Sequence, residues 1–218
     1  MGHNLPVPLT SLVGRSRELD GIGETLRRTR LVTLTGPGGA GKTRLAIEVA
    51  RHQIGRRADG VWLIDLTAAP GDPDPAAEVA RTLDVGGRSS IAPTESLRGF
   101  LVDRDVLLVI DNCEHVIDAC AKLASSLLGV CSRLRILAAS RESLGVSGET
   151  VWRLDALAAE DAQRLFVEGA RQRDPRFVPD GEADATIAAL CERLDGLPLG
   201  DRARRSADRR HVTRREPR

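Results

Sequence analysis

The sequence predicts an α/β fold of three layers, in which helices cover both faces of a mostly parallel five-stranded sheet. Two observations predict it. Short apolar runs of strand length alternate along the chain with stretches long enough to hold crossover helices. A glycine-rich turn also follows one of these runs directly and opens a helical stretch, which is typical of a nucleotide-binding sheet. A small, incomplete helical subdomain is expected after the sheet.

The predicted strands are continuous apolar runs rather than runs that alternate with polar residues. Continuous runs are typical of parallel strands that are buried on both faces of the sheet. The predicted strands cover residues 31–35, 61–66, 106–110 and 134–139, with a shorter fifth run at 150–154.

The predicted helices carry apolar residues at helical spacing. Those of the sheet domain cover residues 16–28, 44–51, 76–83, 94–102 and 116–128. Two more, at 158–171 and 182–194, follow the last strand. We therefore expect a nucleotide-binding domain at 1–156 and a partial helical subdomain at 157–199.

The glycine-rich turn fits the pattern GxxxxGK[ST], which describes a phosphate-binding loop, or P-loop. Backbone N–H groups of such a loop converge on phosphate oxygens, and the following helix directs its positive end toward them. The lysine reaches the outer phosphates and the threonine hydroxyl holds Mg²⁺. A plain tight turn is the alternative, but the strand before it and the helix after it favour the P-loop. The expected ligands are ATP or ADP with Mg²⁺, and the expected site comprises Gly36, Pro37, Gly38, Gly39, Ala40, Gly41, Lys42, Thr43 and the next residue, Arg44.

A second signal of a nucleotide site is an acidic residue at the end of the run at 106–110, where Asp111 follows an apolar strand. A carboxylate at this place orients Mg²⁺ through its water shell. Asn112 comes next, and an amide cannot accept a proton from an attacking water, so we expect slow hydrolysis at most. Glu114 is either a catalytic base or a carboxylate that only favours the start of a helix, and the sequence leaves both open.

A polar end also follows the run at 134–139, in the order Ser140, Arg141 and Glu142. This places a guanidinium where the carboxyl edge of the sheet faces bound phosphate. An arginine at a strand end is often only solvated. We interpret Arg141 as a sensor of the γ-phosphate, because its strand is predicted to lie beside the P-loop strand.

Five motifs in order resemble the NB-ARC module of STAND-class signalling ATPases, most closely that of bacterial transcriptional regulators of the SARP and large LuxR types. The resemblance implies a sheet order of 5-1-4-3-2. It also implies that Gly14 and Arg15 lie by the adenine and ribose, and that Pro198 closes over the base. The motifs are VGRSRE at 13–18, the P-loop, LLVIDNCEH at 107–115, LAASRE at 137–142 and GLPL at 196–199.

Composition limits the other classes of function. The body of the chain is mildly acidic and only 2% of the residues are aromatic, so direct binding of nucleic acid by this segment is not expected. No apolar run reaches the length that spans a bilayer, which makes a cytoplasmic location the expectation. The four cysteines lack metal-ligand or disulfide spacing and are expected to be small buried residues.

The last residues, 200–218, differ in character from the rest, with eight arginines and few apolar residues. Such a segment cannot bury enough surface to offset its ordering entropy, so we expect disorder from about residue 201. Our hypothesis for this end is a single-base frameshift near codon 200, since one shifted frame permits the apolar helix that the family has there. The rival interpretation is an arginine-rich arm for nucleic acid or a membrane surface. The effector, repeat and DNA-binding domains of full-length relatives are expected to be absent.

Three functions remain open on the sequence. The favoured one is a nucleotide-dependent switch that binds ATP or ADP with Mg²⁺ and gives its output through other domains. The second is an enzyme, either a P-loop kinase or an ATPase with steady turnover. The third is a non-functional remnant of a longer regulator.

Overall fold

The computed structural model of the chain describes residues 2–67, 74–86 and 91–193. The GLPL motif with Pro198 and the arginine-rich end at 200–218 lie outside the described residues. Contacts divide the chain into a sheet unit, residues 1–36 with 42–154, and a second unit, residues 37–41 with 155–218.

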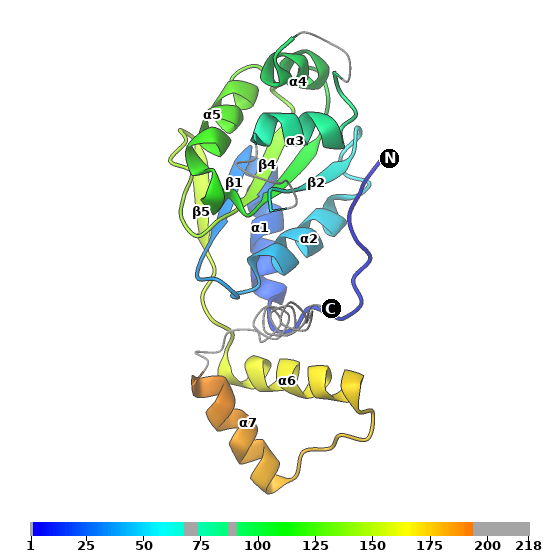
Figure 1. Cartoon of the computed structure of the whole chain (residues 1–218), viewed down its shortest axis with the longest axis vertical. Helices are drawn as coiled ribbons and strands as arrows, with labels where there is room; N and C mark the ends of the chain where they lie inside the picture. The colour runs from blue at the N-terminus through cyan, green and yellow to red at the C-terminus, as the bar shows by residue number, and fades with distance from the viewer. Residues whose placement is uncertain (1, 68–73, 87–90, 194–218) are drawn as a thin grey trace, which may run out of the picture. The chain divides into compact units, whose positions relative to one another are not determined.

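The sheet has five strands, and every neighbouring pair is parallel. Its order is β2-β3-β4-β1-β5, which confirms both the predicted α/β fold and the order 5-1-4-3-2. All carboxyl ends of the strands therefore lie at one edge, with β1 between β4 and β5 (Figure 1). The strands are β1 (Leu31–Thr35), β2 (Val61–Asp65), β3 (Leu107–Asp111), β4 (Arg135–Ala139) and β5 (Glu149–Arg153).

Five α-helices and one 3₁₀ turn accompany the described part of the sheet (Figure 1). The start of α3 shows how the sequence sets a boundary: the Asp74 side chain accepts a hydrogen bond from the backbone N of Ala76 at 3.0 Å, with Pro75 in the first helical turn. The elements are α1 (Ser16–Arg28), α2 (Lys42–Gln53), α3 (Pro75–Thr82), α4 (Pro93–Leu101), η1 (Cys113–His115) and α5 (Ile117–Leu128).

Side chains of the central strands divide between the two faces. Leu108 and Ile110 of β3 are buried in a core that also holds apolar residues of α3, α4 and α5. Because successive side chains of a strand point to opposite faces, Val109 and Asp111 are directed to the other face. Asp111 meets Thr43 of α2 there, so α2 covers the face that carries the acidic strand end.

The N-terminal segment covers the outer edge of β2, which the sequence did not predict. The backbone N of Val61 donates to the carbonyl O of Gly2 at 3.1 Å, and Asn4 makes two hydrogen bonds with the backbone of Leu63. Prolines at positions 6 and 8 limit this pairing to a short stretch, because proline has no N–H to donate. An exposed sheet edge is thereby shielded from pairing with another chain.

The second unit contains a pair of helices, α6 (Ala159–Arg173) and α7 (Gly181–Arg193). They pack around a small core of Leu157, Ala162, Ile187 and Cys191. All four cysteines of the chain are buried free thiols. Among the described helices, none combines the length and apolar character that crossing a membrane requires.

Candidate functional site

The loop that joins β1 to α2 has a backbone that only glycine adopts easily at three places. Gly36, Gly39 and Gly41 have φ angles of 151°, 84° and 88°. Within the loop, the backbone N of Ala40 donates to the carbonyl O of Pro37 at 3.3 Å. The first turn of α2 carries no acidic residue, so no carboxylate opposes an anion at the positive end of this helix.

Lys42 is the first residue of α2, and its Nζ donates to the carbonyl O of Gly36 at 2.8 Å. Lysine carries a compact charge on a flexible stem, so the ammonium can move from this carbonyl to a phosphate oxygen without a backbone change. The structure thus places the predicted phosphate-binding lysine at the carboxyl end of β1.

Thr43 and Asp111, the two predicted magnesium residues, are in direct contact. The Thr43 hydroxyl donates to Asp111 Oδ2 at 2.7 Å, joining the start of α2 to the end of β3. Burial raises the pKa of Asp111, and the charges of Asp65 and Glu114 add to the rise, while hydrogen bonds from Thr43 and the Asn112 backbone oppose it. A cation beside Asp111 would favour its ionised form, and a hydroxyl with a carboxylate is a donor set that fits Mg²⁺.

Asp65 at the end of β2 belongs to the same cluster and was missed in the sequence. Asn112 Nδ2 donates to Asp65 Oδ1 at 3.0 Å and to Asp111 Oδ2 at 3.2 Å, so one amide bridges the acidic ends of two neighbouring strands. Asp65 Oδ1 also accepts from the backbone N and the hydroxyl of Thr67. A signal was present, because the run at 61–65 ends in aspartate just as the run at 106–111 does.

Glu114 and Arg141, predicted separately, form an ion pair. Arg141 Nε lies 3.3 Å from Glu114 Oε1, with 60% of the arginine side chain and 14% of the glutamate side chain exposed. Glu114 Oε2 is buried and has no hydrogen-bond partner among the described residues. The predicted sensor and the predicted base therefore neutralise each other across the ends of β4 and η1.

The remaining predicted residues lie at the entry to the sheet unit. Gly14 has a φ of 71°, and Arg15 is buried with its guanidinium 2.7 Å from Glu18 Oε1 at the start of α1. Arg44 in the first turn of α2 donates to the carbonyl O of Thr10. These contacts attach the segment before α1 to the helix that follows the P-loop.

Comparison with known proteins relates the chain to bacterial regulators. It is 38% identical to an uncharacterized protein of Mycobacterium tuberculosis over 90% of its own length, and 42% identical over 80% of its length to a protein of that organism named as a candidate HTH-type transcriptional regulator. It is 29% identical over 96% of its length to the regulatory protein AfsR of Streptomyces coelicolor. The chain spans 50% of the first of these relatives, 20% of the second and 22% of the third.

Solved structures resemble the fold. A STAND protein with a tetratricopeptide repeat sensor from Pyrococcus horikoshii superposes with a TM-score of 0.58 and 21% identity, covering 89% of this chain and 30% of that protein. A Walker-type ATPase of Pyrococcus abyssi gives a TM-score of 0.56 at 15% identity, covering 86% of this chain and 65% of that protein. No protein-family model matches the chain. The fold is therefore that of P-loop ATPases.

Proposed function

We propose that this chain, a P-loop ATPase fold homologous to bacterial transcriptional regulators, binds an adenine nucleotide with Mg²⁺ and acts as the switch of such a regulator. The relatives, which are bacterial regulators and include AfsR, and the shared fold of a STAND protein support the predicted resemblance to NB-ARC modules of SARP-type regulators. The nucleotide, the cation and the switching are the proposed part.

The hydrogen bond between Thr43 and Asp111 carries the proposal. It holds a hydroxyl and a buried carboxylate 2.7 Å apart at the carboxyl edge of the sheet, directly after the P-loop lysine. In this arrangement Lys42 would bind the outer phosphate oxygens, and Thr43 and Asp111 would hold Mg²⁺ between the nucleotide and β3. Bound Mg²⁺ would neutralise phosphate charge. Gly14 and Arg15 are proposed to lie by the adenine and ribose.

Slow turnover is part of the proposal, because neither residue predicted to lie near the attacking water, Asn112 or Glu114, is well suited to activate it. Asn112 offers an amide whose Nδ2 already bridges Asp65 and Asp111. Glu114 is only 14% exposed, and its Oε2 is buried without a hydrogen-bond partner among the described residues, so this carboxylate has little access to an attacking water. A switch that keeps its nucleotide is favoured by these contacts over an enzyme that consumes it.

Arg141 is proposed to report the γ-phosphate by exchanging partners. In the described structure its guanidinium is held by Glu114, and a terminal phosphate would compete for it with a greater charge. ADP lacks that phosphate and leaves the ion pair in place. The helical segment, proposed to form a subdomain at 157–199, would respond to this exchange.

Arg141→Ala is expected to weaken ATP binding about 10-fold or more and to leave ADP binding unchanged, since a hydrogen bond to a charged group contributes ~1.5–3 kcal/mol. Titration calorimetry with a non-hydrolysable ATP analogue and with ADP measures both affinities. Arg81→Ala is the matched control, because Arg81 is a similarly exposed arginine paired with a glutamate of its own helix. An equal loss for both nucleotides would contradict the sensor role.

The test of the function is nucleotide binding by the purified chain. Calorimetry is expected to show saturable heat with ADP and ATP in Mg²⁺, and weaker binding when the cation is chelated. Hydrolysis in the same samples is expected to stay below about 1 s⁻¹, the low end of ordinary enzyme turnover. A well-folded sample that gives no heat with either nucleotide rules the proposal out, and rapid turnover rules out a slow switch.

A further inference from the structure

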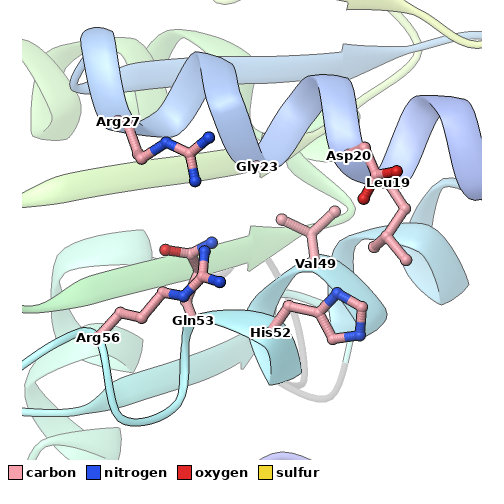
Figure 2. A pocket seen from close by; sticks show the side chains of 8 residues that line it. All are labelled: Leu19, Asp20, Gly23, Arg27, Val49, His52, Gln53 and Arg56. Carbon is pink, nitrogen blue, oxygen red and sulfur yellow. The ribbon is translucent and has the colours of Figure 1, made fainter.

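A pocket lies between α1, which lines it from Leu19 to Arg27, and the C-terminal end of α2, away from the P-loop. Its volume is about 270 Å³, and apolar walls from Leu19 and Val49 adjoin several polar side chains (Figure 2). The lining residues are Leu19, Asp20, Gly23, Arg27, Val49, His52, Gln53 and Arg56.

Gln53 gives the pocket an unused hydrogen-bond donor. The side chain is 1% exposed, and its Oε1 accepts from the guanidinium of Arg57 at 3.3 Å. Because an arginine can only donate, this contact fixes which end of the amide is oxygen. Nε2 is then the other end, and it is buried without a hydrogen-bond partner among the described residues. A buried donor left in this way is unfavourable until an acceptor reaches it.

Gly23 supplies the space opposite this amide. The Gln53 amide points toward α1 in Figure 2, and a Cβ built on Gly23 would lie 3.9 Å from Gln53 Nε2, with no other atom of the neighbouring structure within 4 Å. The absence of a side chain at Gly23 therefore leaves room at the place from which an acceptor can approach Nε2.

Charges around the pocket favour an acceptor that is anionic. The Arg56 guanidinium forms no hydrogen bond or ion pair with the part of the chain that the structure describes. Arg27 is paired with Glu24, and His52 lies 3.9 Å from Glu48. Asp20 is the one acid in the lining, and Figure 2 shows it at the opposite end from Arg27 and Arg56. An oxyanion bound near Arg27 and Arg56 would face hydrogen-bond donors and would lie away from the negative charge of Asp20.

This pocket is separate from the nucleotide site. Helix α2 runs from Lys42 to Gln53, which corresponds to about 16 Å at 1.5 Å per residue. Arg57, which holds the Gln53 amide, pairs with Asp105 at 3.3 Å, just before β3 begins, whereas Asp111 ends that strand. The two sites thus lie at opposite edges of the sheet.

We propose that this pocket binds a small organic anion whose carboxylate or phosphate oxygens accept hydrogen bonds from Gln53 Nε2 and Arg56. A volume near 270 Å³ lies just under the roughly 300–1,000 Å³ of sites for drug-sized ligands. The ligand is accordingly a compact molecule of metabolite size. Leu19 and Val49 cover its apolar part.

The test uses NMR of the side-chain amide of Gln53 in the full chain, titrated separately with succinate and with inorganic phosphate. Saturable shifts with succinate alone identify a carboxylate ligand, and saturable shifts with phosphate alone identify a phosphate ligand. The Gly23→Ala variant fills the space opposite Nε2 and suits a helix, so it is expected to melt no lower than the wild type. The affinity of Gly23→Ala for whichever of the two anions binds the wild type is expected to fall at least 10-fold.

Two further variants make the result decisive. Gly99→Ala is the matched control, since it also places alanine in a helix and its Cβ meets nothing within 4 Å, and it is expected to bind like the wild type. Arg56→Ala changes an exposed side chain without touching the helix packing and is expected to bind at least 10-fold more weakly. No saturable shift with either probe means that the pocket holds water only. A shift that persists with unchanged affinity in both Gly23→Ala and Arg56→Ala shows that the anion does not bind in this pocket. Either outcome overturns the proposal.

Discussion

Lys42→Ala is expected to weaken ADP and ATP binding about 100-fold or more while the melting temperature of the nucleotide-free chain stays close to that of the wild type. The expected loss follows from one charged hydrogen bond to phosphate, which contributes ~1.5–3 kcal/mol, and from the phosphate charge left unneutralised. Lys42 is only half-buried at the start of α2, and the Gly36 carbonyl that its Nζ contacts lies in the loop rather than in the hydrophobic core, so we expect the fold to tolerate the substitution.

Lys122→Ala is the matched control, because Lys122 is the second of only two lysines in the chain and lies exposed on α5. Calorimetry with Mg²⁺ and ADP is expected to give the wild-type affinity for this control. If Lys42→Ala binds nucleotide with wild-type affinity, the P-loop is not the nucleotide-binding site. If both variants lose the same amount of affinity, the loss reflects net charge and not a specific contact of Lys42.

Gly36→Ala is expected to lower the free energy of unfolding of the sheet unit by about 2–4 kcal/mol, from backbone strain together with overpacking. The φ of Gly36 is 151°, and an added Cβ would lie 2.6 Å from the carbonyl O of Leu154. That backbone is itself fixed, because the Leu154 N donates to the carbonyl O of Thr35 at 2.7 Å. The start of the loop would move, so nucleotide affinity is expected to fall with stability.

Urea denaturation followed by tryptophan fluorescence measures this effect, since Trp62 and Trp152 both lie in strands of the sheet. Gly145→Ala separates the two causes. Its φ is 70° and its Cβ meets nothing within 4 Å, so it carries strain of about 1–2 kcal/mol without a collision. If Gly36→Ala costs no more than Gly145→Ala, the contact with Leu154 is not the constraint described here.

The elements that could be predicted from the sequence are those whose signal is local. Buried parallel strands are continuous apolar runs, and all five predicted strands begin and end within one residue of β1 to β5. The P-loop is equally local, because eight consecutive residues specify its glycines, its lysine and its threonine. Asp111 was predictable because it directly follows such a run.

The contacts that could not be predicted from the sequence depend on which elements become neighbours in the folded chain. The ion pair of Glu114 with Arg141 joins residues after different strands, and each alone was assigned a separate role. The bridge from Asn112 to Asp65 requires β2 beside β3. Nothing in the spacing of Asn4 indicates that it pairs with Leu63, 59 residues later. The Gln53 pocket likewise exists only because two helices pack side by side.

The conformation of Asn112 has a consequence for how this chain could change over time. Its φ of 64° lies in the left-handed region, which asparagine tolerates better than most residues. A glutamate there, the acid that would accelerate hydrolysis, would adopt a strained backbone and stand among Asp65, Asp111 and Glu114 without the amide that now separates two of them. If the chain is the slow switch proposed above, one substitution at this position would bring backbone strain of about 1–2 kcal/mol and charge repulsion together with the new base, so a rapid ATPase is not reached in a single favourable step.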